Sequence, residues 1–306
     1  MTYLTKISRM HISIIIPTYN GLAKLKKHLP SVLAAAADGD ELVIGDDASI
    51  DQTFDWLKTQ FQLTEVIVAR LLNLPTNYQL KSSAFKLYQG HFSAQHKIIA
   101  IRVLVSARNL RYAATVNLAA VFCTHDYFFL INNDVSCRLD CIEILKRSLT
   151  DSQLFAVGCL EYPNKNSTEK SGKNILWFER GLFQHSKAVD FETGATAWVS
   201  GGSGFFSKNK WLQLGGFDLR FYPAYWEDID LCFRARRRGW KVWFNAKAVV
   251  YHEHESTHLD VFGQSVITQI SWKNATAFTW KNSSLSQKFL FICWSPYWLV
   301  QRLRSR

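Results

Sequence analysis

Short, continuously apolar runs alternate with amphipathic stretches through the first half of the chain. Residues 11–17 (HISIIIP) and 41–45 (ELVIG) are rich in aliphatic side chains, as is typical of parallel strands that are buried on both faces. Between them, from residue 22 to residue 36, apolar side chains recur at helical spacing. A strand, a helix and a second strand in this order make a βαβ unit. The pattern therefore predicts an α/β fold with a central, mostly parallel sheet.

The alternation continues to about residue 258, with one unclear interval. Further strands are expected at 65–70, 98–105, 126–131 and 154–158, and further helices at 53–60 and 141–149. Residues 74–95 show no clear period, so the interval 61–104 is interpreted as an insertion or a long loop.

The last part of the chain has a helical period and is rich in aromatic and basic residues. Its apolar run, 289–300, is too short to span a membrane and contains Pro296, which is expected to break it. Two interpretations remain open for this tail. It is either an interfacial anchor, with Trp and Tyr beside an apolar face and Lys and Arg around it, or a helix that packs on the domain.

Composition narrows the class of protein. With 306 residues, 48% hydrophobic and 20% charged, the chain is globular. A net charge of +11 suits nucleic acid, an anionic membrane or a phosphorylated substrate. No RNA-binding motif or zinc-finger spacing is present, so a nucleic-acid partner is not expected. Six cysteines without a CxxC pair, and no signal peptide or spanning segment, predict a reduced, cytoplasmic protein.

Polar residues follow three of the expected strands. The sequences are PTYN at 17–20, DDAS at 46–49 and NND at 132–134. In an open α/β sheet, ligands bind beyond the carboxyl ends of the strands, so these segments are expected to line one crevice. Turn and N-cap preferences of Asp, Asn and Ser are the alternative explanation.

Three acids crowd into four positions farther along the chain, at Glu227, Asp228 and Asp230. The spacing after them is helical and Gly239 is a suitable stop, so the acids are expected in the first turn of a helix. Acids there interact favourably with the helix dipole and stabilise the helix by roughly 0.3–1 kcal/mol each. The functional alternative is a general base beside a substrate hydroxyl, with its pKa tuned by the neighbouring acid.

The surroundings of these acids resemble a known family. GGFD at 215–218, an aromatic loop, EDxDLxxR and a strand that ends at His252 resemble the C-terminal half of family-2 glycosyltransferases. The closest similarity is to rhamnosyltransferase-like enzymes of bacterial surface-polysaccharide synthesis. The resemblance implies a GT-A-like, Rossmann-type three-layer domain and an inverting transfer with Asp228 as the base and Glu227 beside it. It places Gly201, Gly202, Trp226 and Asp230 on the acceptor side.

The same resemblance assigns the donor side. Asp46 or Asp47 would contact the nucleotide base, and Asp134, with His252, would hold Mg²⁺ or Mn²⁺. Two residues depart from the family pattern: Asn132 replaces the first Asp of the metal motif, and Arg111 replaces a Gly. The full set of expected nucleotide-sugar contacts is Pro17, Thr18, Tyr19, Asn20, Asp46, Asp47, Ser49, Asn109, Arg111, Asn117, Asn132 and Asn133.

The expected organisation is a glycosyltransferase domain at 1–258, with a nucleotide-sugar half at 1–135 and an acceptor half at 136–258. A helical tail, 259–306, would touch the inner face of the cell membrane. The expected partners are a nucleotide-sugar donor and a glycan or lipid-linked acceptor. Two alternatives remain: a degenerate nucleotide-sugar-binding scaffold, and a nucleotidyl- or phosphotransferase.

Overall fold

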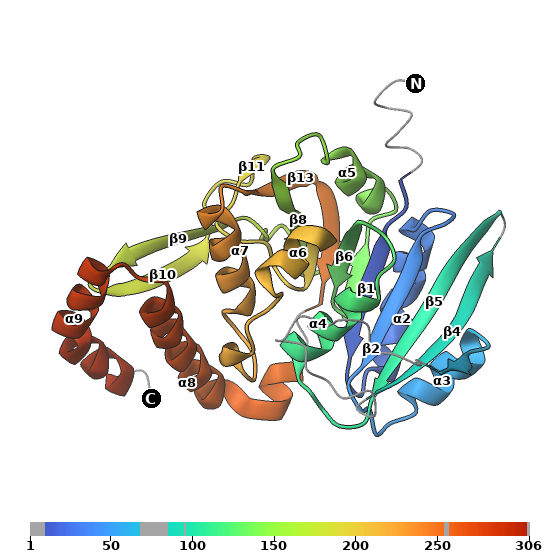
Figure 1. Cartoon of the computed structure of the whole chain (residues 1–306), viewed down its shortest axis with the longest axis horizontal. Coiled ribbons are helices and arrows are strands. Elements are labelled where there is room, and N and C mark those ends of the chain that lie inside the picture. Colours follow the sequence, from blue (N-terminus) through green and yellow to red (C-terminus); the bar gives the residue numbers. More distant parts are fainter. Residues whose placement is uncertain (1–9, 68–84, 95, 254–256, 305–306) are drawn as a thin grey trace.

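The computed structural model describes residues 10–67, 85–94, 96–253 and 257–304. Within them, an 11-stranded sheet forms the middle layer, in the order β11-β13-β8-β12-β6-β1-β2-β5-β4-β3, with β7 paired to β13 (Figure 1). The strands that point in one direction include β1 (Ser13–Thr18), β2 (Glu41–Asp46), β5 (Lys97–Ser106), β6 (Tyr127–Ile131), β8 (Leu154–Tyr162) and β13 (Lys241–His252). The strands that run against them include β12 (Ser203–Ser207), β4 (Phe85–Ala94), β7 (Val135–Cys137) and β11 (Gly194–Ala195).

Strand direction decides what meets at the sheet edge. The carboxyl ends of β1, β2, β6 and β13 lie at the same end of the strands, and β12, which is antiparallel to β6, brings its amino end there. The segments that follow Thr18, Asp46 and Ile131 therefore meet the loop before Ser203.

Helices cover both faces of the sheet, and the two cores explain why. In β1, Ile14 and Ile16 pack into one apolar cluster while Ile15 packs into the other, as period-2 alternation requires. The first cluster is covered by α2 (Leu22–Ala35), α3 (Thr53–Gln60) and α5 (Cys141–Arg147), and the second by α4 (Tyr112–Phe122), α6 (Lys208–Leu214) and α7 (Glu227–Arg237). The predicted three-layer α/β fold is confirmed.

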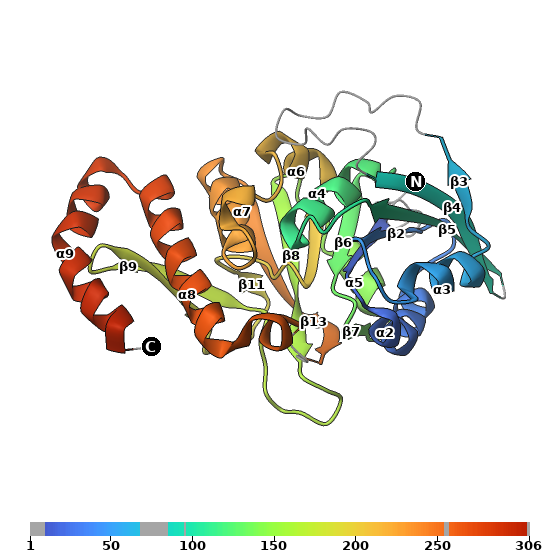
Figure 2. The same ribbon diagram turned by 90° about the horizontal axis from the view of Figure 1, so that it is seen from below.

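The C-terminal helices lie at one end of the molecule, beside the hairpin of β9 (Asn174–Glu179) and β10 (Leu182–Lys187), as Figures 1 and 2 show. They are α8 (Thr257–Asn282) and α9 (Leu285–Arg304). Phe278 of α8 is fully buried in the main core, so this helix packs on the domain. The expectation that Pro296 breaks the last segment is wrong, because α9 continues through it. In the described part of the chain, no helix is both long and apolar enough to cross a bilayer.

The unclear interval holds a β-hairpin. Strand β4 pairs antiparallel with β5 along its whole length, and β3 (Thr64–Val66) extends the sheet at its edge. The interpretation of 61–104 as an insertion or long loop missed β4, because its second half mixes Gly90, His91 and Ser93 with apolar residues. The expected strand at 65–70 ends at Val66, and its last three residues lie outside the described ones.

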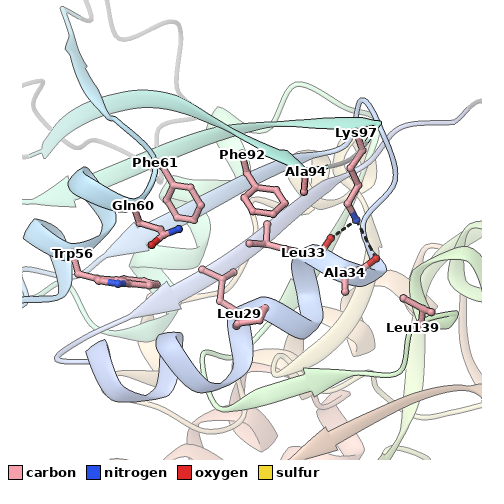
Figure 3. A pocket seen from close by; sticks show the side chains of 11 residues that line it. Leu29, Leu33, Ala34, Trp56, Gln60, Phe61, Phe92, Ala94, Lys97 and Leu139 are labelled. Carbon is pink, nitrogen blue, oxygen red and sulfur yellow. Dashed lines mark hydrogen bonds between the residues drawn. The ribbon is translucent and has the colours of Figure 1, made fainter.

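An apolar hollow of about 520 Å³ lies between α2, α3 and the β4–β5 hairpin. Trp56, Phe61 and Phe92 line it (Figure 3). Lys97 Nζ reaches its rim and donates to the carbonyl groups of Leu33 and Ala34, at 2.5 and 3.1 Å. The ammonium therefore caps the C-terminal end of α2, where the helix dipole favours a cation.

Candidate active site

The predicted convergence of strand ends produces a pocket of about 350 Å³. Asp47, Asp134 and Asp228, which come from three distant parts of the sequence, all line it. Lining residues also come from the loops before β12 and before α7. The full lining is Pro17, Thr18, Tyr19, Asp47, Asn109, Arg111, Tyr112, Thr115, Asn132, Asn133, Asp134, Ser200, Gly201, Gly202, Pro223, Ala224, Tyr225, Glu227, Asp228 and His252.

The acid pair stands at the start of α7, where the backbone turns sharply. Tyr225 and Trp226 both have positive φ, 72° and 78°, and α7 begins at the next residue. Asp228 Oδ1 accepts from the Ile229 N–H at 2.8 Å, and its Oδ2 accepts from the Gly201 N–H at 3.3 Å. These two bonds fix the carboxylate of Asp228 while it faces the pocket.

Both acids hold their protons more tightly than usual. Burial, and then the negative charge of Asp228, raises the pKa of Glu227 to about 8. Burial raises the pKa of Asp228 to about 6, against the opposing effect of its backbone hydrogen bonds. The two carboxyl groups therefore lose their protons in two separate steps, and Asp228 is the more acidic of the pair. A carboxylate with a pKa near the working pH is suited to act as a general base.

Asp134 and His252 both line the pocket and contact each other, with Asp134 Oδ1 3.2 Å from His252 Nε2. Burial would raise the pKa of Asp134, but the hydrogen bond and charge of His252 and the charge of Lys24 lower it. Burial would likewise lower the pKa of His252, but its hydrogen bond to Asp134 and the charges of Glu161 and Asp134 raise it. Lys24 Nζ is 3.7 Å from Asp134 Oδ2. One carboxylate oxygen of Asp134 therefore lies beside His252 and the other lies beside the ammonium group of Lys24.

Asp134, His252 and Asn132 are the residues nearest to a site for the divalent cation that the resemblance implies. Asn132 is close by: a Cβ at Gly202 would come within 2.8 Å of Asn132 Nδ2 and 3.2 Å of His252 Cε1. Among the described residues, no group of three or more His, Cys, Asp and Glu side chains is placed to hold a metal. Asp134, with His252 beside it, could hold a cation whose other ligands are phosphate oxygens, since Mg²⁺ is usually bound by one or two carboxylates together with substrate phosphates.

Backbone hydrogen bonds hold Asp47 in place in the pocket lining. Its two carboxylate oxygens accept from the backbone N–H groups of Leu110 and Arg111, at 2.6 and 2.8 Å. Burial raises its pKa, while these bonds lower it. Asp47 thus joins the end of β2 to the start of α4, and both segments reach the pocket.

The comparison with protein families decides the assignment. The glycosyltransferase-like family 2 matches this chain over residues 9–275. The chain belongs to this family. It is a glycosyltransferase that binds a sugar nucleotide.

One curated relative of this glycosyltransferase is the O-antigen chain rhamnosyltransferase RfbN of Salmonella typhimurium. The two are 22% identical over 256 residues, which are 83% of this chain and 69% of the relative.

Solved structures with the same fold are distant in sequence. A Pyrobaculum calidifontis mannosyltransferase in complex with GDP-Man and Mn²⁺ matches with a TM-score of 0.57 at 15% identity, over 90% of this chain and 66% of the other. GalNAc-T7 with UDP, GalNAc and Mn²⁺ matches at 0.55 and 13%, over 79% and 44%. Staphylococcus aureus TarS with UDP-GlcNAc matches at 0.51 and 13%, over 86% and 66%. This glycosyltransferase thus spans two thirds or less of the length of these solved chains, whose likeness shows the GT-A fold.

Several predicted contact residues of the glycosyltransferase lie outside the pocket. Asn20 and Ser49 hydrogen-bond each other's loops, with the Asn20 N–H 2.9 Å from Ser49 Oγ. Asp46 does not line the pocket and accepts from the Ser49 N–H at 3.0 Å, so Asp47 is the one of the two acids that lines the site. The side-chain amide of Asn117 binds the backbone of Phe217 through two hydrogen bonds of 2.8 and 2.9 Å. These residues shape the loops around the site.

Two expected acceptor-side residues require correction. Trp226 is 4% exposed and its ring packs against His185 and Phe278 in the core. Asp230 is fully buried and binds Lys281 Nζ at 2.7 and 2.9 Å and Arg234 Nε at 2.7 Å. Neither lines the pocket. Asp230 follows Asp228 by two positions in α7, so its side chain points about 200° away from that of Asp228.

The sequence did not single out several lining residues, among them Tyr112, Thr115, Ser200, Pro223, Ala224 and Tyr225. Tyr112 matters most, because its hydroxyl donates to the carbonyl of Gly201 at 2.7 Å. The N–H of the same glycine donates to Asp228, so Tyr112 steadies the loop that orients the acid. Its position directly after Arg111 in a segment expected to abut the donor was the available signal.

Proposed function

We propose that this glycosyltransferase moves a sugar from a nucleoside-diphosphate donor to a hydroxyl of a glycan or a lipid-linked oligosaccharide, with inversion at the anomeric carbon. One observation carries the proposal: the carboxylate of Asp228 faces the same pocket as Asp47 and Asp134 and is held there by the N–H of Gly201. A fixed base on one side of a donor pocket suits direct attack from that side.

The pocket has residues suited to the nucleoside of the donor and others suited to its diphosphate. Asp47 stands where the nucleoside would lie, with Tyr19 and Thr115 beside it in the pocket lining. Asp134 and His252, with the amide of Asn132, would hold Mg²⁺ or Mn²⁺ against the diphosphate. When bound, the cation would neutralise charge on the leaving diphosphate. The Mn²⁺ named with the Pyrobaculum calidifontis mannosyltransferase and with GalNAc-T7 supports this assignment.

The acceptor step is a single displacement. The acceptor hydroxyl oxygen forms a bond to the anomeric carbon as the bond from that carbon to the diphosphate oxygen breaks. Asp228 takes the hydroxyl proton, and the nucleoside diphosphate leaves with the electron pair of the broken bond. The raised pKa of Glu227 reduces the negative charge that the pair presents to the incoming donor.

The acceptor class is inferred from the relatives. The rhamnosyltransferase from Salmonella typhimurium is named for the O-antigen chain, which supports a role in cell-surface polysaccharide synthesis. A nucleotidyl- or phosphotransferase would leave the Glu227–Asp228 pair without an acceptor role. The degenerate scaffold is disfavoured by an intact, oriented base in the pocket.

A panel of nucleoside-diphosphate sugars tests the proposal. We expect slow hydrolysis of one donor class, and transfer once a matching glycan is added. NMR of the product should show an anomeric configuration opposite to that of the donor. Retention of configuration, or phosphate rather than sugar in the product, would refute it.

We also propose that α9 rests on an anionic membrane surface at the inner face of the cell membrane. Leu285, Phe289, Ile292 and Leu299 follow one another at helical spacing and are 86%, 67%, 59% and 58% exposed. Aromatic rings and cations surround this stripe, with Lys288 Nζ 5.2 Å from the Trp280 ring centroid. Apolar residues flanked by aromatic and basic ones are typical of interfacial helices. The free cysteines fit a reducing compartment.

A further inference from the structure

Arg111 has a backbone conformation that is normally left to glycine. Its φ and ψ are 70° and 168°, a region that other residues rarely occupy and that clusters at functional sites. Neighbours hold it there: its N–H donates to Asp47 Oδ2 at 2.8 Å and to Asn109 Oδ1 at 3.0 Å. A glycine would adopt this conformation without strain, so the arginine side chain calls for an explanation.

The side chain lines the pocket and brings a permanent positive charge to it. Among the lining residues in the described part of the chain, Arg111 is the one Lys or Arg, and the acids Asp47, Glu227 and Asp228 line the same pocket. Its Nε donates to the hydroxyl of Tyr222 at 3.4 Å, a long bond to a side chain that is 54% exposed. The guanidinium is therefore held between the donor-side helix α4 and the loop that leads to α7.

The candidate cation site in the same pocket has few negatively charged ligands. Its carboxylate, Asp134, is shared with His252 at 3.2 Å and Lys24 at 3.7 Å, and Asn132 offers an uncharged amide. A diphosphate brings negative charge that must be neutralised in this pocket. A guanidinium matches phosphate oxygens with two parallel hydrogen bonds and keeps its charge at any physiological pH.

We propose that Arg111 is a resident cation for the donor's diphosphate, so that this enzyme binds nucleoside diphosphates even without a divalent ion. The inference rests on the proposed function. The guanidinium exchanges its long contact with Tyr222 for the phosphate oxygens, and a bound divalent ion adds to its effect.

Isothermal titration of the full chain tests this, with UDP, GDP and dTDP and the matching monophosphates, each in EDTA and in Mn²⁺. For whichever base binds, the wild type should bind the diphosphate in EDTA. Arg111→Gly, which suits the backbone, should weaken that binding by about ten-fold or more, the effect expected for losing a charged hydrogen bond. Arg111→Lys should lose less, and the monophosphate should be affected less than the diphosphate.

Arg108→Gly is the matched control, because Arg108 is exposed, lies three residues away and does not line the pocket. It should leave the affinity in EDTA unchanged. Equal diphosphate affinity for Arg111→Gly and the wild type, or binding by the wild type in Mn²⁺ but not in EDTA, would overturn the inference and leave the proposed function standing. The absence of nucleotide binding under either condition would refute both the inference about Arg111 and the proposed function.

Discussion

Asp228 and Asp230 stand two residues apart in one helical turn and have different surroundings. Asp228 faces the pocket and binds two backbone N–H groups, whereas Asp230 points into the core and binds Lys281 and Arg234. At 3.6 residues per turn, side chains two positions apart point about 200° from each other. The sequence could therefore have shown that both acids cannot face one substrate, although not which of them does.

Replacing Asp228 by Asn should reduce sugar transfer by about 10² to 10⁴-fold, the usual contribution of a general base. Nucleotide affinity should be retained, because the substitution keeps the shape of the side chain. Transfer assays and titration of the nucleotide on the same preparation measure the two effects. A variant with full transfer activity would show that another group takes the proton.

Activity should depend on pH through both acids. It should rise as Asp228, with a pKa of about 6, loses its proton, and fall as Glu227, with a pKa of about 8, becomes charged and repels the diphosphate. The profile of kcat/KM should be bell-shaped with limbs near these values. Glu227→Gln should lose the alkaline limb and keep the acid one; an unchanged alkaline limb would assign it to another group.

Helix α8 is the element that fixes the acceptor side of the pocket. Asn274 Nδ2 donates to the carbonyls of Phe221, Ala224 and Tyr225, at 3.1, 2.8 and 3.0 Å, and so holds the loop before α7. The periodic spacing predicted this helix. Its role could not be predicted, because the partners of Asn274 and Lys281 are about fifty residues earlier in the chain. Strand β4 was missed for a similar reason: pairing with β5, more than its own pattern, makes it a strand.

Removing the charge that α8 supplies should destabilise the fold. Lys281→Met leaves the fully buried Asp230 with fewer partners and Asp218 without its ion pair, so we expect a loss of up to about 3 kcal/mol. Urea unfolding followed by circular dichroism measures it. Lys273→Met, at an exposed position of the same helix, should change stability by no more than about 0.5 kcal/mol. Equal effects of the two substitutions would show that the ion pairs of Lys281 do not stabilise the fold.

At the scale of the whole molecule, strand direction was the most predictable feature and also the one that makes the site. The apolar runs around Ile15 and Val43 predicted parallel strands, and their ends meet in one pocket with Asp134 and Asp228. The positions of α8 and α9 relative to the domain could not be predicted, because they depend on contacts with the β9–β10 hairpin.

The exposed stripe of α9 should bind anionic vesicles. Phe289→Glu with Ile292→Glu should release the protein from phosphatidylglycerol-containing vesicles in a flotation assay, while neutral vesicles should bind little of either form. Ile67→Glu with Ile98→Glu is the control, since these residues are 90% and 61% exposed; Ile67 follows β3 and Ile98 lies in β5, and both strands lie far from α9 in Figure 2. Equal release by both pairs would point to net charge alone.

A structure of the enzyme with a nucleoside diphosphate and Mn²⁺ tests the central claim most directly. We predict that the nucleoside lies against Asp47, the diphosphate lies between Arg111 and Asp134, and the carboxylate of Asp228 stays open on the far side of the pocket. Nucleotide bound elsewhere, for instance in the apolar hollow beside Trp56, or a diphosphate that covers Asp228, would contradict the account.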